Sequence, residues 1–224
     1  GGGHSVAWDF VSESSQAQEP RGGLLLDSNK LWGVAAQWWS FGVDGQIYYY
    51  DIDLDTVVTV YINGSSTGVF QRPIGELVKY NGKFYGVTEE GGDYDDGILF
   101  FYDPQDDSLG VLLHLNASTI GGNPQAGVTL KNGQIFWHNK GGAYSFGTLL
   151  RYNINTSTLT KLRDFDGTND GAYPYSKPFV DGGYVYGVTA IKYGSSTGGV
   201  VYKLNPSTYA YQVLEVLNIW EGRP

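Results

Sequence analysis

The chain has 224 residues, with 14 basic and 23 acidic side chains and a formal net charge of -9. This balance argues against nucleic acid as a partner, because binding to phosphates needs clustered Lys and Arg. The sequence contains no Cys, which excludes disulfides and Cys-ligated zinc. No apolar run approaches the length of a membrane helix, so we predict no membrane insertion.

Glycine and aromatic residues dominate the composition, with 33 Gly, 18 Tyr, 10 Phe and 6 Trp. Aromatic side chains suit the pleated surface of a sheet, and glycine supplies the tight turns between strands. No long stretch shows the apolar spacing of three and four residues that is typical of a helix. We therefore predict an all-β protein. Residues 1–3 are interpreted as a linker or an expression remnant and are left out of the fold prediction.

Two sets of markers repeat along the chain with a period of about fifty residues. They are the prolines Pro20, Pro73, Pro124, Pro174 and Pro224, and the glycines Gly45, Gly97, Gly147 and Gly199, which each open an aromatic-aliphatic segment. The agreement of two independent sets predicts four tandem repeats, at approximately residues 20–72, 73–123, 124–173 and 174–223. We expect them to form a single domain over residues 4–224.

Each repeat reads as four short strands in chain order. In the first repeat these are residues 22–26, 31–34, 47–50 and 57–62, and in the second they are 75–78, 84–88, 98–102 and 109–115. The third repeat continues with 135–137, 149–152 and 159–165, and the fourth with 185–189, 200–204 and 211–217. Asn81-Gly82 and Asn132-Gly133 predict hairpins between first and second strands. Four antiparallel strands in about fifty residues are typical of a propeller blade, so we predict a β-propeller-like array.

A glycine lies inside the second strand of three repeats, at Gly33, Gly86 and Gly187. An interior glycine marks a close approach of another group, which we expect from backbone crowding near a central channel. The third repeat carries Trp137 and His138 in this region instead.

The residues before the first repeat form a surplus strand in this scheme. Residues 5–11 precede Pro20 much as a fourth strand precedes Pro174. There are thus five fourth-strand segments but four sets of the other strands. The chain is therefore either part of a longer repeat array or a subunit whose terminal strand completes a blade in another copy.

Two repeats resemble a known family. The matching segments are residues 85–92 with 97–104, and residues 186–189 with 199–206, together with residues 165–174. They are similar to the repeat of the choice-of-anchor tandem-repeat GloVer-containing proteins, a group of bacterial surface or secreted proteins. The resemblance implies export and propeller-like repeats, and it implies no catalytic residues. The first and third repeats match loosely, which predicts specialised loops there.

The loops between second and third strands should lie on one face of such an array. They gather aromatic rings beside polar groups, a combination that suits sugars because rings stack on apolar sugar faces. The candidate ligand-binding residues are Trp38, Trp39, Glu89, Glu90, Tyr94, Trp137, His138, Asn139, Lys192 and Tyr193. The competing interpretation is that these aromatic side chains pack one blade against the next.

Two further kinds of site are weaker candidates. Hard oxygen ligands for calcium could come from residues 93–96 or from Asp164, Asp166 and Asp170, although turn-forming Asp explains the same pattern. Sequons at Asn63, Asn116 and Asn155 are candidate glycosylation sites in an exported protein. We predict no other cofactor.

The sequence thus favours an extracellular or cell-surface, non-catalytic binding module, with a glycan as the candidate ligand. The alternative is a surface-assembly subunit that associates through terminal β-strand exchange. A carbohydrate-active hydrolase or lyase is the least favoured interpretation, because Glu89 and Glu90 are adjacent on a strand and would point to opposite sides.

Overall fold

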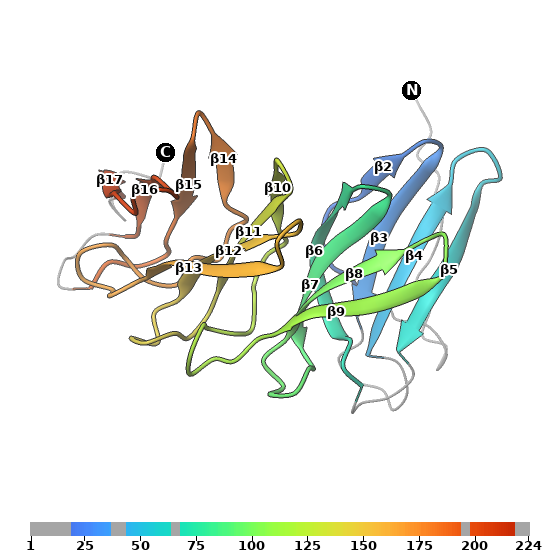
Figure 1. The fold of residues 1–224 in the computed structure, drawn as a ribbon, viewed down its shortest axis with the longest axis horizontal. Helices are drawn as coiled ribbons and strands as arrows, with labels where there is room; N and C mark the ends of the chain where they lie inside the picture. The colour runs from blue at the N-terminus through green and yellow to red at the C-terminus, as the bar shows by residue number, and fades with distance from the viewer. Residues whose placement is uncertain (1–18, 37–43, 64–67, 194–197, 218–224) are drawn as a thin grey trace, which may run out of the picture.

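The computed structural model describes residues 19–36, 44–63, 68–193 and 198–217. These residues form four antiparallel sheets and contain no helix, so none of them builds a helix able to cross a membrane. The four sheets stand side by side as blades along an arc, with blade 1 and blade 4 at opposite ends (Figure 1). The predicted all-β, propeller-like array of four repeats is confirmed. The surplus strand predicted at residues 5–11 lies outside the described residues.

The blades follow one another in chain order. Blade 1 contains β1 (Glu19–Pro20), β2 (Leu25–Asp27), β3 (Lys30–Ala36), β4 (Gly45–Asp51) and β5 (Thr56–Asn63). Blade 2 contains β6 (Gln71–Tyr80), β7 (Lys83–Glu90), β8 (Ile98–Asp103) and β9 (Ser108–His114). Blade 3 contains β10 (Thr129–Lys131), β11 (Gln134–Asn139), β12 (Thr148–Asn153) and β13 (Thr158–Asp164). Blade 4 contains β14 (Phe179–Asp181), β15 (Tyr184–Val188), β16 (Val200–Leu204) and β17 (Tyr211–Val216).

The predicted Asn-Gly hairpins are present between first and second strands. Asn81 and Gly82 have φ angles of 49° and 81°, and Asn132 and Gly133 have 51° and 72°. Two successive positive φ angles are the signature of a type I′ turn, whose twist matches that of the strands it joins. Local sequence therefore determines these two connections.

The prediction placed the first strand after each repeat proline. This is confirmed in blades 3 and 4, where β10 and β14 begin after Pro124 and Pro174, but it is wrong in blades 1 and 2. Pro20 pairs with Ala35 and Pro73 pairs with Thr88, so both prolines belong to the first strand itself. In blade 1 this strand is split into β1 and β2, and in blade 2 it continues as β6 with a register shift after Ile74. Proline is tolerated there because the first strand is an edge strand, with one side free of ladder hydrogen bonds.

Every blade also contains a β-bulge that the sequence analysis did not predict. The register of the third and fourth strands shifts at one equivalent place in each sheet, leaving Val60, Leu112, Leu162 and Leu214 as the extra residues. A bulge adds local twist to a strand. Its fourfold recurrence shows that the four repeats share fine backbone geometry as well as strand order.

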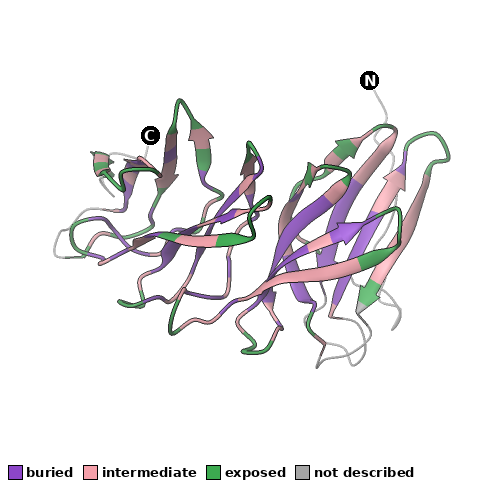
Figure 2. Cartoon of the chain, viewed as in Figure 1, coloured by how far each residue is buried: buried purple, intermediate pink, exposed green. Residues whose placement is uncertain are grey.

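Each blade buries one face against its successor. We call the face toward the next blade the trailing face and the face toward the previous blade the leading face. Trp32 and Ile47 of blade 1 pack on Phe84 and Phe100 of blade 2, and the same pattern joins blade 2 to blade 3 and blade 3 to blade 4. Figure 2 shows this burial along the second and third strands, with exposed residues at turns and outer strands. The core is therefore a series of interfaces between blades.

The glycines of the second strands have a different role from the predicted backbone crowding. Gly86 pairs with Phe100 of the third strand, and a Cβ added to Gly86 would lie 2.7 Å from the Phe100 ring. Gly33 with Tyr48 and Gly187 with Tyr202 repeat this arrangement. These glycines therefore make room for a cross-strand aromatic ring. Backbone crowding occurs instead in the first strands, where a Cβ on Gly75 would lie 2.1 Å from Gly127.

Blade 3 reverses this pairing of a glycine with a ring. Trp137 takes the glycine position of the second strand, and its cross-strand partner is Leu150, which occupies the ring position. Both side chains are fully buried in the interface between blades 2 and 3. The bulky ring has moved from the third strand to the second, so the interface is filled from the neighbouring strand.

Candidate functional site

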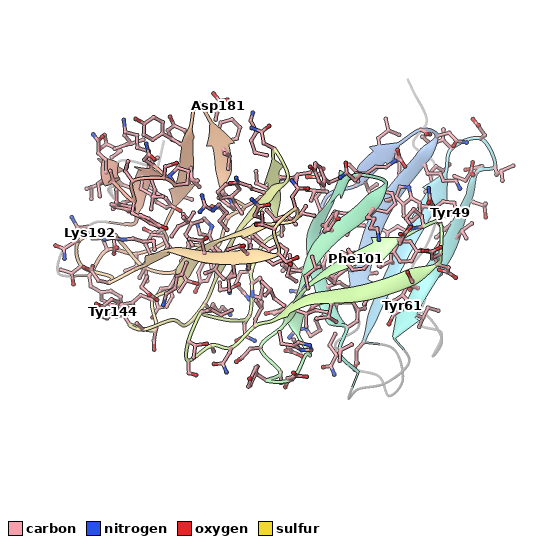
Figure 3. The ribbon with its side chains drawn as sticks, viewed as in Figure 1. Tyr49, Tyr61, Phe101, Tyr144, Asp181 and Lys192 are labelled. Atoms are coloured by element: carbon pink, nitrogen blue, oxygen red, sulfur yellow. The ribbon has the colours of Figure 1, made fainter. Side chains whose placement is uncertain are left out.

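The loops between second and third strands and the connections between blades reach the same side of the array, which we call the loop face (Figure 1). In Figure 3, Tyr144 lies on this side and Asp181, in the β14–β15 hairpin, lies on the opposite side. Pro20 and Pro73 belong to the innermost strands of their blades, and Pro124 and Pro174 lie shortly before β10 and β14.

A pocket of about 470 Å³ opens where the first strands of blades 1, 2 and 3 converge. The residues that line it are Pro20, Arg21, Gly22, Ile74, Gly75, Gln125, Ala126 and Gly127. Arg21, Ile74 and Gln125 each directly follow a repeat proline. Because the glycine backbones beside them are in close contact, these three side chains define the chemistry of the pocket.

An ion-pair cluster stands beside this pocket. The Glu89 carboxylate accepts from the Arg21 guanidinium at 2.9 Å and lies 2.9 Å from that of Arg72. It also accepts from the Gln125 amide at 2.8 Å, and Arg72 forms a second ion pair with Glu90. Three blades therefore meet at one carboxylate. The two cations and two anions balance, so the cluster offers polar groups without net charge.

Glu89 is held in its ionised form by these partners. Burial alone would raise its pKa, but the Gln125 hydrogen bond and the guanidinium groups of Arg72 and Arg21 outweigh burial and lower the pKa below its usual value. Glu89 therefore acts as an acceptor at neutral pH. A general acid for glycoside hydrolysis needs the opposite shift, a raised pKa.

The residue before the repeat proline adopts an unusual backbone in three blades. Arg72, Asn123 and Tyr173 have φ angles of 50°, 47° and 59°. Positive φ is costly for residues other than glycine, and such strain persists only where surrounding contacts impose it. The contacts are visible here, because Asn123 donates to the Glu89 carbonyl at 3.0 Å and Arg72 binds both glutamates.

A separate aromatic cluster lies on blades 3 and 4. The rings of Tyr173 and Tyr175 stack with centroids 6.0 Å apart and planes 10° apart. Phe146 of the blade 3 loop packs on Tyr173 and, at 5.0 Å between centroids, on Tyr193 of blade 4. Tyr175 is 49% exposed and Tyr193 is 42% exposed. The cluster therefore leaves ring surface in solvent on the loop face.

Tyr94 and Tyr144 occupy equivalent loop tips in blades 2 and 3. Both lie in the pattern Gly-Gly-x-Tyr-x-x-Gly, and they are 57% and 58% exposed. The loops close in the same way, by Gly97 N donating to the Gly91 carbonyl and Gly147 N donating to that of Gly141. The loop of the third repeat was predicted to be specialised, but its backbone closes in the same way as the loop of the second repeat. Tyr144 was not among the candidate site residues, although it holds the same position in its repeat as Tyr94 holds in the preceding one.

Three of the predicted ligand-binding residues are buried and do not contribute to this surface. Trp137 is fully buried, and its indole N–H donates to Asn139 at 2.9 Å. Asn139 in turn donates to the Gly121 carbonyl. For Trp137 the competing interpretation, packing of one blade against the next, is the correct one. A single sequence does not distinguish a ring in an interface from a ring on a loop.

His138 is also buried, and it joins blade 3 to blade 4. Its Nδ1 lies 2.7 Å from the Ser176 carbonyl and its Nε2 lies 2.6 Å from the Tyr202 hydroxyl. Since a carbonyl only accepts, Nδ1 carries the proton and Nε2 accepts from Tyr202. Burial lowers the His138 pKa to about 4, although the Ser176 hydrogen bond opposes this effect. The neutral ring is therefore a structural link.

The predicted calcium ligands are used within their own loop. Asp166 accepts from the backbone N–H groups of Thr168 and Asn169, and Asp170 accepts from Arg163 at 2.6 Å. Asp164 pairs with Lys161. Within the described residues, no three His, Cys, Asp or Glu side chains are grouped so as to hold a metal ion. Asp166 stabilises a turn, whereas Asp164 and Asp170 form ion pairs.

Some of the remaining candidates lie at described loop positions, and the others lie outside the described residues. Lys192 and Tyr193 lie in the blade 4 loop, and Figure 3 shows Lys192 at that end of the array. Asn155 is exposed in a hairpin turn, whereas the amide oxygen of Asn116 accepts from Ser118. Trp38 and Trp39 lie outside the described residues, as does the side chain of Asn63.

Sequence reasoning missed Arg21, Arg72, Gln125, Tyr173 and Tyr175. All five lie within one residue of a repeat proline. The proline period itself could have identified them, because it marks where the chain enters the innermost strand of each blade.

Several solved structures have a fold similar to that of this chain. A chain of the nidogen/laminin complex superposes with a TM-score of 0.58 at 13% identity, over 90% of this chain and 64% of that chain. TolB from Acinetobacter baumannii gives 0.58 at 15%, over 90% of this chain and 45% of its own. A family 117 glycoside hydrolase of the marine bacterium Zobellia galactanivorans gives 0.52 at 11%, over 93% and 72%. These are propeller folds.

The fold is a β-propeller array. The similarity extends to the fold alone, because the identities are low and the similar chains include binding proteins and enzymes. This propeller chain spans about two thirds of the nidogen/laminin chain and less than half of TolB. No protein-family model matches the sequence, and no curated protein matches it.

Proposed function

We propose that this propeller is a non-catalytic binding module that takes a glycan on its loop face. The observation that carries the proposal is the aromatic cluster of Phe146, Tyr173, Tyr175 and Tyr193, in which two tyrosines keep between two fifths and half of their surface in solvent. Aromatic surface that serves only to join blades is buried, as Trp137 is. Exposed rings that already pack on one another are pre-arranged for a flat ligand.

Polar groups beside the rings support a hydroxylated ligand. Tyr173 and Tyr193 bring their hydroxyls within 3.3 Å of each other, so both can serve one ligand group. The ion-pair cluster at the pocket of blades 1 to 3 is neutral in sum and presents amide, guanidinium and carboxylate groups. This combination suits an uncharged sugar. The resemblance to exported repeat proteins favours an extracellular or cell-surface location.

A glycan array followed by calorimetry tests the proposal. We expect binding to a defined class of oligosaccharide, with a loss of about tenfold or more in affinity for Tyr175→Ala and for Tyr193→Ala. The matched control is Tyr209→Ala, because Tyr209 is 50% exposed and lies in the β16–β17 turn, away from the loop face. A negative array, or equal affinity in both cluster variants and the control, would contradict this function.

A further inference from the structure

Blade 4 has a trailing face built like those of the other blades. In the strand register, Tyr186 and Val201 of blade 4 correspond to Phe136 and Leu149 of blade 3. Phe136 and Leu149 are buried against blade 4 and belong to the core between the two blades. The repeat has thus placed interface residues on a face that no described blade covers.

Exposure separates this face from its equivalents. Leu115 and Phe165, which directly follow the fourth strands of blades 2 and 3, are fully buried, whereas their counterpart Leu217 is 42% exposed. The second-strand positions show the same difference: His138 is 3% exposed, but Val188 is 38% exposed. Phe179, Leu214 and the tyrosines of β15 add apolar side chains to this face, which also carries Lys203 and Glu215.

Blade 1 presents the opposite half of such an interface. Its leading face carries Leu24 and Leu26, which are 47% and 61% exposed. The register places Leu24 where blade 2 has Leu77, which is buried against blade 1, and places Leu26 where blade 4 has Val180, which packs on blade 3. One end of the array therefore displays a trailing face and the other a leading face.

We propose that the trailing face of blade 4 packs on the leading face of blade 1 in a second copy of this chain. The interface continues the one already formed three times within the molecule, so it needs no new type of contact. It is heterologous, because the two copies contribute different faces. If both interfaces close between two copies, their described residues form a ring of eight blades, within the range of about four to eight found in closed propellers.

This packing of faces differs from the terminal strand exchange considered from the sequence. Strand exchange adds a strand at an outer edge and leaves both apolar faces unused. Face packing depends on Phe179 and Leu26, which are 65% and 61% exposed and can be changed without disturbing a buried contact. It is also independent of any ligand bound at the loop face.

Sedimentation equilibrium over about a hundredfold range of concentration tests the proposal. We expect a species of twice the 24.5 kDa chain mass, and a monomer for Phe179→Glu and for Leu26→Glu. Leu54→Glu is the matched control, because Leu54 is 72% exposed in the β4–β5 turn and lies on neither face. Circular dichroism should report the same fold for all three variants.

Mixing the two monomeric variants tests whether the trailing face of one copy packs on the leading face of the other. A Phe179→Glu copy keeps an intact leading face and a Leu26→Glu copy keeps an intact trailing face, so the mixture should regain association through one native interface. A wild-type chain that is monomeric at every concentration would overturn the proposal. Association that survives Phe179→Glu would overturn it as well.

Discussion

The size of a side chain in the second strand is matched to the size of its cross-strand neighbour in the third strand. Gly86 and Phe100 form one cross-strand unit, and Trp137 and Leu150 form another with the sizes reversed. Trp137 is fully buried, and its indole N–H donates within the blade. The stability that it contributes therefore depends on Leu150 as much as on Trp137 itself.

Two substitutions test this dependence: one removes the Trp137 ring, and the other places a ring at position 150 instead. We expect Trp137→Gly to lower the free energy of unfolding by about 3–5 kcal/mol, because it leaves a cavity between blades 2 and 3. Adding Leu150→Phe recreates the pairing of the other blades and should restore part of the loss. Urea denaturation of both single variants and the double variant measures the coupling. Simple additivity of the two changes would contradict the proposed exchange of positions.

His138 makes the free energy of unfolding depend on pH between about pH 4 and pH 6.5. The folded-state pKa is about 4, below the usual histidine value of 6.5, so between these values the unfolded chain binds a proton that the folded chain does not. Stability contributed by neutral His138 is thus complete above about pH 6.5 and is lost as the pH falls toward 4, by up to about 3 kcal/mol.

Unfolding free energies measured between pH 7 and 4 should show this slope. His138→Gln removes the titrating group and should flatten the curve over the same window, whatever its stability at pH 7. Tyr202→Phe keeps the imidazole and removes the hydroxyl that donates to it, so the slope should remain. Identical slopes for the wild type and His138→Gln would show that another group is responsible.

At the scale of strands and turns, glycine serves two separate purposes in blade 2. Gly82 lies in the β6–β7 turn with φ of 81° and has no atom within 4 Å of an added Cβ. Gly86 lies in β7 without a positive φ, but an added Cβ would lie 2.7 Å from the Phe100 ring. The first glycine is needed for its backbone angle and the second for its lack of volume.

A pair of alanine substitutions distinguishes these reasons. Gly82→Ala should cost about 1 kcal/mol of backbone strain, and Gly86→Ala should cost about 1–3 kcal/mol from overpacking. Phe100→Leu should relieve the cost of Gly86→Ala and leave that of Gly82→Ala unchanged. Chemical denaturation of the three single variants and the two double variants with Phe100→Leu reports both couplings. Relief of Gly82→Ala by Phe100→Leu would contradict this division of roles.

The strand pattern was accessible from the sequence because its causes are local. Alternating aromatic and β-branched residues mark strands, and Asn81-Gly82 imposes a type I′ turn wherever it occurs between strands. The split of the first strand into β1 and β2 was not accessible in this way. Pro20 ends a conventional strand prediction, and only the free edge of the innermost strand allows it to pair with Ala35.

At the scale of the whole molecule, the blades stack through apolar faces that repeat with the sequence. The same repeat leaves one trailing face and one leading face at the two ends of the arc in Figure 1. The candidate site also belongs to this scale. Glu89 comes from blade 2, while its partners Arg21 and Gln125 come from blades 1 and 3.

Prediction of the site was accordingly partial. Glu89, Tyr94 and Tyr193 were identified because loops of equivalent position must share a face. Trp137 and His138 were assigned to that face by the same reasoning and are buried, because nothing local separates a ring that enters a blade interface from one that leaves it. Arg21 was missed because its partner Glu89 belongs to the next blade, 68 positions away in the sequence.

The sequence by itself determined the repeat period, the all-β class, the four strands of each blade and the hairpin turns, since each depends on residues close together in the chain. Only the tertiary structure decided which rings are buried, which carboxylates meet guanidinium groups and which glycines face rings or backbone. The physical reason is that burial and electrostatic pairing depend on the packing of one blade against the next. That packing joins residues far apart in the chain, such as Glu89 with Gln125 at a separation of 36 positions and with Arg21 at 68, and no local pattern records it.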